Sequence, residues 1–146
     1  MKICFLCHGN ICRSVAAEVI AKQYIKENNI DGIEVFSRAL SNEEYGNDIY
    51  FPMKKTLIEN GYKPDHHFAQ KISQKEVDES DYIFYMDKYN LELINWYFPN
   101  DINKFHLLSE FSDQKYIEDP WYTNRFSYVF NQIKIATFAI LEHFKN

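Results

Sequence analysis

The sequence predicts an α/β fold built on a mostly parallel sheet. Short apolar runs typical of buried strands recur along the chain, and segments with helical apolar spacing lie between them. No internal repeat or linker interrupts this alternation. A chain of 146 residues, 46% of them hydrophobic, is long enough to bury one core, so we expect residues 1–146 to form a single domain.

The first half of the chain alternates strands and helices. Residues 2–6 (KICFL) are predicted to form a short buried strand, and helical apolar spacing predicts a helix over about 14–28. Residues 33–37 (IEVFS) form the second predicted strand. The next helix is expected to open at Pro52 and close at Gly61, because proline is favoured in the first turn of a helix and glycine just after its end.

The second half continues the alternation. Ser73 and Glu76 have the spacing of a capping box, which predicts a short helix. Residues 81–86 (DYIFYM) and 104–108 (KFHLL) are predicted strands, with a helix over about 88–97 between them. The last helix is predicted from one apolar stripe, formed by Phe126, Val129, Phe130, Ile133, Ala136, Ile140, Leu141 and Phe144.

Composition excludes several classes of partner. Sixteen Lys and Arg against 21 Asp and Glu give a net charge of −5, so we expect no nucleic-acid partner and no anionic membrane surface. No apolar run approaches the ~18 residues of a membrane span, and no secretory signal is recognisable. All 3 cysteines lie within the first twelve residues, which is no disulfide framework. These features predict a cytoplasmic protein.

The segment CHGNICRS, residues 7–14, joins the first predicted strand to the first helix. Ligands of such sheets bind beyond the carboxyl ends of the strands, where this segment lies. A loop that enters a helix offers free backbone N–H groups and the positive end of the helix dipole, which together bind anions. Gly9 and Asn10 tolerate left-handed backbone angles, which would let consecutive amides curl inward around the anion. Arg13 adds a planar fork suited to two phosphate oxygens.

The same segment supplies a nucleophile. A phosphoryl group bound by the loop would meet Cys7, and a cysteine at a helix N-terminus near an arginine can have a pKa of roughly 3.5–7.5. Ser14 is close enough in sequence to donate a hydrogen bond to the sulfur. Attack of a thiolate on phosphorus would form a cysteinyl-phosphate, which water must later open.

A second motif, IEDPWY at residues 117–122, offers an acid for the leaving group. An aryl phosphate leaves as a phenolate, whose conjugate acid has a pKa of about 10, so a general acid accelerates the reaction. Pro120 favours an extended conformation at Asp119, from which the carboxyl can reach into a cleft. We expect Asp119 to protonate the leaving oxygen and then to accept a proton from water. Trp121 and Tyr122 would form aromatic walls.

With these two motifs the chain resembles the low-molecular-weight protein tyrosine phosphatases. That family has C-x5-R-S at its N-terminus and an Asp-Pro acid loop more than a hundred residues later. Here Cys7, Arg13 and Ser14 match the first motif, and Asp119-Pro120 matches the second. The resemblance continues through SRALSNEEYGN (37–47), HFAQKIS (67–73), DYIFYMD (81–87) and the final helix.

The resemblance implies a three-layer fold, with a four-stranded parallel sheet flanked by helices. It also implies a phosphatase that acts on phosphotyrosine in proteins or peptides and needs no metal or other cofactor. The loop residues that would bind or shape the phosphate site are His8, Gly9, Asn10, Ile11, Cys12, Arg13 and Ser14. His67 would support Asn10, and Asp87 would be a buried structural carboxylate. The substrate ring would lie among Tyr45, Trp121 and Tyr122.

The chain departs from the family pattern at four positions. Val15, Gln70, Trp121 and Thr123 stand where the family usually has Pro, Arg, Tyr and Gly. None of these departures touches the nucleophile, the arginine or the acid, so they bear on substrate preference. In the loop 41–51, the carboxylates of Glu43, Glu44 and Asp48 are expected to disfavour acidic residues beside the phosphotyrosine.

The cysteines allow other interpretations. Cys4 and Cys7 formally make a C-x2-C pair, but a zinc site would need a second pair, and no cysteine follows residue 12. A thioredoxin-like pair would straddle the helix N-terminus, whereas Cys4 lies inside the predicted strand, where it is interpreted as a core residue. Cys12 is either a packing residue or a thiol that traps oxidised Cys7 as a disulfide, and the sequence leaves both readings open.

Four other functions compete. Arsenate reductases of this fold use further downstream cysteines, which this chain lacks. Protein-arginine phosphatases have Thr where this chain has Ile11, so phosphoarginine remains the alternative substrate and the choice rests mostly on one residue. A non-catalytic phosphate-binding module would be expected if Cys7, Arg13 or Asp119 were missing. Rhodanese-like sulfurtransferases have no need of an Asp-Pro acid.

Overall fold

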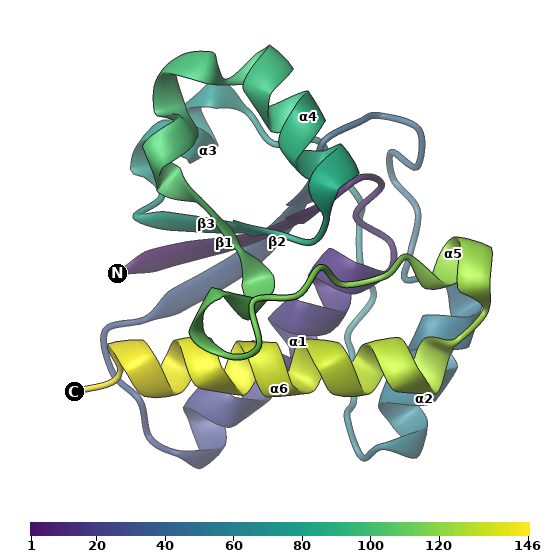
Figure 1. Ribbon diagram of the computed structural model, residues 1–146. Helices are drawn as coiled ribbons and strands as arrows, with labels where there is room; N and C mark the ends of the chain where they lie inside the picture. The colour runs from purple at the N-terminus through teal and green to yellow at the C-terminus, as the bar shows by residue number, and fades with distance from the viewer.

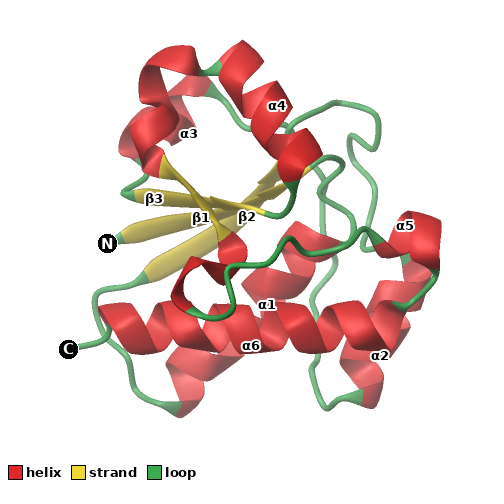
Figure 2. Ribbon diagram, viewed as in Figure 1, coloured by secondary structure: helices red, strands yellow, loops and turns green.

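The computed structural model describes residues 1–146 and contains one parallel sheet between two layers of helices (Figures 1 and 2). The strands are β1 (Lys2–Cys7), β2 (Glu34–Ala39), β3 (Tyr82–Tyr85) and β4 (Phe105–Leu107). They pair in the order β2-β1-β3-β4, and every pair is parallel. The expected α/β fold with a four-stranded parallel sheet is therefore confirmed.

Helices cover both faces of the sheet. One face carries α1 (Arg13–Glu27), α2 (Phe51–Glu59) and α6 (Phe126–Phe144), and the other carries α3 (Gln74–Glu79) and α4 (Lys88–Tyr97), as Figure 1 shows below and above the strands. Helices α1 and α6 pack directly against each other. The remaining helices are short: η1 (Pro99–Lys104), η2 (Leu108–Phe111) and α5 (Pro120–Thr123). No helix of the structure combines the length and the apolar character that crossing a membrane requires.

The alternation of side chains along β1 divides the core in two. Ile3, Phe5 and Cys7 belong to the larger apolar cluster, which includes residues of α1 and α6. Cys4 and Leu6 belong to the smaller cluster, which includes residues of α3 and α4. Successive side chains of a strand point to opposite faces. Cys4 therefore lies in the core on the face opposite Cys7, and the two thiols do not form a metal-binding pair.

Local sequence signals set several helix ends. The Ser73 hydroxyl accepts a hydrogen bond from the Glu76 N–H, and the Glu76 carboxylate accepts one from the Ser73 N–H, which confirms the capping box. Asp87 caps α4 by accepting a hydrogen bond from the Asn90 N–H at 2.8 Å. Gly61, just beyond α2, has a φ of +88°, a conformation that costs glycine little.

Some boundaries differ from the predicted ones. Strand β2 extends beyond residue 37 because Arg38 and Ala39 still pair with Leu6 and Cys7 of β1. Helix α2 starts at Phe51 and ends at Glu59, two residues before Gly61. The helices η1, η2 and α5 are not indicated by the sequence, because segments of 6, 4 and 4 residues are too short to display an amphipathic repeat.

Candidate active site

Residues 7–14 connect the carboxyl end of β1 to the start of α1, as predicted. Asn10 has a φ of 60°, so it adopts the expected left-handed conformation. Gly9 does not, because its φ lies outside that region. Its lack of a side chain serves close packing instead: a Cβ at Gly9 would lie 3.3 Å from Cγ of Glu44, tighter than an ordinary contact. Gly9 therefore lets the segment after β2 approach the loop.

The side chain of Asn10 is fully buried and braces the loop. Its Nδ2 donates to the hydroxyl of Ser14 at 2.9 Å and to the hydroxyl of Ser37 at 3.0 Å. Its Oδ1 accepts from the backbone N–H of Gln70 at 3.2 Å. Three segments that are distant in the sequence are thus fixed around one amide, and the Gln70 side chain takes no part in these bonds.

His67 supports the same residue from outside. Its Nε2–H donates to the backbone carbonyl of Asn10, with 2.6 Å between the atoms. Burial lowers the pKa of His67 and outweighs the opposing effect of this hydrogen bond. The backbone N–H of His67 donates to Asp48, which also pairs with Lys54 at 2.7 Å. Asp48 therefore anchors its own loop and does not line the pocket.

The thiol of Cys7 faces Ser14 at the start of the loop. Cys7 Sγ and Ser14 Oγ are 3.0 Å apart, and both residues are buried. Because Asn10 already donates to Ser14 Oγ, the hydroxyl proton of Ser14 is free to point at the sulfur. The side chain of Cys12, the residue before α1, caps no N–H group of the first turn of that helix. Such uncapped N–H groups are suited to an anion.

Arg13 is buried beside three acceptors, with only 2% of its surface exposed. Its Nη1 donates to Asp87 at 2.7 Å and to the carbonyl of Ile117 at 2.8 Å, and its Nη2 lies 3.4 Å from Asp119. Burial alone would lower the pKa of Arg13, but the negative charges of Cys7, Asp87 and Asp119 outweigh it and raise that pKa. The guanidinium stays charged and fixed. Asp87, expected to be buried, is partly exposed.

Asp119 lies at the start of α5 in an extended conformation, with φ −89° and ψ 111°, as Pro120 predicts. One carboxylate oxygen accepts from the Trp121 N–H at 3.0 Å, and the other faces Arg13. Just before it, the Ile117 N–H donates to the carbonyl of Met86 while the Ile117 carbonyl accepts from Arg13. These bonds tie the acid segment to the end of β3 and to the loop.

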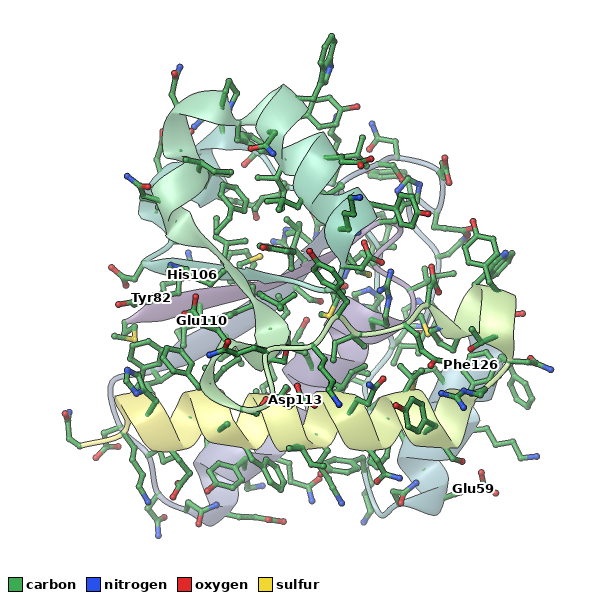
Figure 3. All side chains as sticks on the ribbon, in the orientation of Figure 1. Glu59, Tyr82, His106, Glu110, Asp113 and Phe126 are labelled. Carbon is green, nitrogen blue, oxygen red and sulfur yellow. The ribbon has the colours of Figure 1, made fainter.

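These groups surround one pocket. It is lined by Cys7, His8, Gly9, Ile11, Cys12, Arg13, Glu43, Glu44, Asp119, Trp121 and Tyr122. Asn10, Ser14 and His67 lie outside this lining and support it from behind. Trp121 packs against the ring of Tyr50, with 4.8 Å between centroids, and Tyr50 also contacts Phe126, labelled at the base of α5 in Figure 3.

Tyr45 does not lie where the family resemblance implies. Its side chain is 64% exposed and packs edge-to-face on Phe68, with 5.2 Å between ring centroids, and it does not line the pocket. From this segment, Glu43 and Glu44 line the pocket instead. Sequence reasoning also missed Tyr50 as the support of Trp121, and no local pattern indicates this contact.

The thiols of Cys12 and Cys4 are less suited to act as nucleophiles, because their pKa values are raised. Burial raises the pKa of Cys12, with a further contribution from the neighbouring Cys7, and burial raises that of Cys4. All three cysteines are free. The disulfide between Cys7 and Cys12 therefore stays a hypothesis. No three His, Cys, Asp or Glu side chains are grouped so as to hold a metal ion.

Comparison with known proteins links this geometry to one family. The model of the family described as low molecular weight phosphotyrosine protein phosphatase matches residues 2–146. The low molecular weight protein-tyrosine-phosphatase PtpA of Staphylococcus aureus is 33% identical over 133 residues, which cover 90% of this chain and 85% of that protein.

Solved structures agree. YfkJ from Bacillus subtilis superposes with a TM-score of 0.92 at 26% identity, covering 98% of this chain and 93% of that one. The tyrosine phosphatase SP-PTP from Streptococcus pyogenes gives 0.89 at 28% identity, covering 99% and 93%. A Drosophila arginine phosphatase, DARP, gives 0.88 at 31% identity and covers 100% of this chain and 99% of that one.

Proposed function

The chain belongs to the low molecular weight phosphotyrosine protein phosphatase family, and on this premise we propose that it hydrolyses phosphotyrosine in proteins and peptides through a cysteinyl-phosphate. Family membership makes it a phosphatase. The proposal concerns its substrate and the roles of its residues. Residues 1–146 act as one catalytic domain in this proposal, in the cytoplasm and without a cofactor.

The phosphoryl group binds where the loop amides, the first turn of α1 and Arg13 converge. Arg13 neutralises its charge with N–H groups that are not engaged by Asp87 or Ile117. Because burial and its carboxylate partners fix the guanidinium before substrate arrives, little reorganisation is needed on binding. The aromatic ring of the substrate lies against Trp121 and Tyr122.

The first chemical step breaks the bond between phosphorus and the phenolic oxygen. The Cys7 thiolate, stabilised by the Ser14 hydroxyl, attacks phosphorus and forms an S–P bond. Asp119 gives its proton to the departing oxygen, which leaves as a neutral phenol. In the second step, water attacks the cysteinyl-phosphate, Asp119 accepts a proton from it, and the S–P bond breaks to release phosphate and the thiolate.

One observation carries this proposal: a single pocket is lined by Cys7, the buried Arg13 and Asp119, a carboxylate 106 residues from Arg13 in the sequence. Behind the lining, the Ser14 hydroxyl lies 3.0 Å from the Cys7 sulfur. A phosphate-binding module would need the arginine and the loop but not the acid. The acid brought to the same pocket favours catalysis.

Phosphoarginine is the second candidate substrate, because an arginine phosphatase is among the similar structures. The choice depends on Ile11, which lines the pocket with an apolar side chain. An apolar wall suits the ring of phosphotyrosine better than the N–H groups of a phosphorylated guanidinium, which it would leave without partners.

The test compares phosphate release from a phosphotyrosine, a phosphoarginine and a phosphoserine peptide, with Cys7→Ser as the blank. We expect fast turnover of the phosphotyrosine peptide that the blank abolishes. Preference for phosphoarginine would keep the mechanism and replace the substrate. No turnover of any peptide would overturn the catalytic proposal.

A further inference from the structure

We propose that the pocket selects phosphotyrosyl peptides that carry Lys or Arg beside the phosphotyrosine, and that Glu43 and Glu44 make this selection. The inference rests on the proposed function and names the class of substrate that the same site accepts. Besides the arginine and the acid of the proposed mechanism, the two glutamates are the only carboxylate or cationic side chains in the lining, apart from the imidazole of His8.

Both carboxylates are held by neighbouring side chains. Glu43 Oε2 lies 3.0 Å from Nε2 of His8, and Glu44 Oε2 accepts from Nδ2 of Asn47 at 2.7 Å. The segment that carries the glutamates is also bonded to the backbone of the loop. Ser41 donates to the carbonyl of His8 from its N–H at 3.1 Å and from its hydroxyl at 3.0 Å. Glu43 and Ser41 therefore tie this segment to His8, the residue that follows the proposed nucleophile, whereas Glu44 is held within the segment by Asn47.

The charge balance of the pocket supports the selection. Arg13 has two carboxylate partners, Asp87 and Asp119, whereas neither Glu43 nor Glu44 pairs with a Lys or an Arg. Two carboxylates without a Lys or Arg partner beside an anion site weaken the binding of a bare phosphate. A Lys or Arg beside the phosphotyrosine is attracted to the same two carboxylates. This attraction offsets the repulsion between the carboxylates and the phosphate, so a basic peptide binds more tightly than a bare phosphate.

The range of this effect covers the residues adjacent to the phosphotyrosine. Charges at a surface interact over about 8 Å at physiological ionic strength, roughly the span of two extended residues. A Lys or Arg at that distance is attracted to the two carboxylates, and an Asp or Glu is repelled. The aromatic walls, Trp121 and Tyr122, carry no charge that would oppose this preference.

The experiment measures kcat/KM for three phosphotyrosyl peptides that differ only in their flanks: lysine, alanine or glutamate on either side. The proteins are the wild type, the double variant Glu43→Gln/Glu44→Gln, and the control Glu59→Gln/Glu92→Gln. Glu59 and Glu92 are exposed and form no ion pair, so the control removes the same charge elsewhere. In Figure 3, Glu59 is labelled below α6, while α5 lies above it.

We expect the wild type and the control to prefer the basic peptide over the acidic one by about tenfold. The ratio should fall to about twofold in the Glu43→Gln/Glu44→Gln protein, and it should shrink for the wild type in 1 M salt, where the screening length is about 3 Å. If all three proteins turn over the peptides with one ratio, the selection is overturned and the proposed function stands. If the wild type hydrolyses none of the peptides, the proposed function fails, and the inference fails with it.

Discussion

Replacing Asn10 tests the loop architecture most directly. In Asn10→Ala, three hydrogen bonds to Ser14, Ser37 and Gln70 disappear from a fully buried site. Two of the partners are hydroxyls, and the Ser37 hydroxyl keeps its bond to Glu18. The backbone N–H of Gln70 loses its side-chain acceptor, which is the costlier loss because a partly buried donor without an acceptor keeps much of its desolvation penalty.

The expected magnitude follows from these contacts. The bonds contribute on the order of 1 kcal/mol each, and the unpaired Gln70 N–H adds to their loss. Alanine at a φ of 60° costs about 1 kcal/mol more than asparagine, which tolerates the left-handed region. We therefore expect Asn10→Ala to lower the free energy of unfolding by about 4 kcal/mol.

Asn10→Gly separates the two causes. Glycine loses the same hydrogen bonds but accepts the left-handed conformation, so this variant should be more stable than Asn10→Ala by about 1 kcal/mol. Urea unfolding of both variants and the wild type, followed by linear extrapolation, measures the differences. A loss below about 1 kcal/mol in Asn10→Ala would refute the bracing role. Equal stabilities of the two variants would refute the backbone argument.

Three further predictions concern the acid, a histidine and the core. Asp119→Asn should reduce kcat by about 10²–10⁴ for aryl phosphates with poorly acidic phenols and less for more acidic ones, in steady-state assays; one loss for every phenol would argue against a general acid. Because burial holds the pKa of His67 below its unfolded value, the unfolded chain binds the proton first. The stability that the neutral, buried imidazole of His67 allows is fully present above about pH 6.5, and it is lost as the pH falls through the pKa of His67 in the folded protein. In His67→Gln the urea midpoint should depend less on pH in that range, and an unchanged dependence would contradict the assignment. Ile133→Ala, at a fully buried position of α6, should cost about 2–5 kcal/mol in unfolding free energy. Ile135→Ala, at a side chain 60% exposed, should stay within about 0.5 kcal/mol, and similar losses for the two would refute the burial pattern.

The parts of the fold and site that the sequence predicts are those with a local signature. Strand β1, helix α6 and the capping box at Ser73 each follow from residues a few positions apart. The position of the loop at the end of β1 follows equally, because the switch from strand to helix occurs within residues 7–14. The extended conformation at Asp119 follows from the proline after it.

The remaining features depend on contacts between distant segments. The bond from Arg13 to Asp87 spans 74 positions, and no periodicity links them. For Tyr45 the family motif led to a wrong expectation. The motif predicts that this side chain lines the pocket, but Tyr45 lies beside a turn at Gly46, with a φ of +86°, and packs on Phe68 instead. Composition and spacing identify reactive residue types, but the direction of a loop side chain is decided by the partner it meets.

The packing of the first helix against the last has a consequence for protein synthesis. Asp119 follows Arg13 by 106 positions, and at a ribosomal rate of about 5–20 residues per second this interval takes on the order of 5–20 s. Throughout that time the emerging polypeptide contains Cys7 and Arg13 but neither the acid nor the α6 surface that covers α1. In the proposed mechanism, the complete site therefore forms only after the acid segment and α6 have been synthesised.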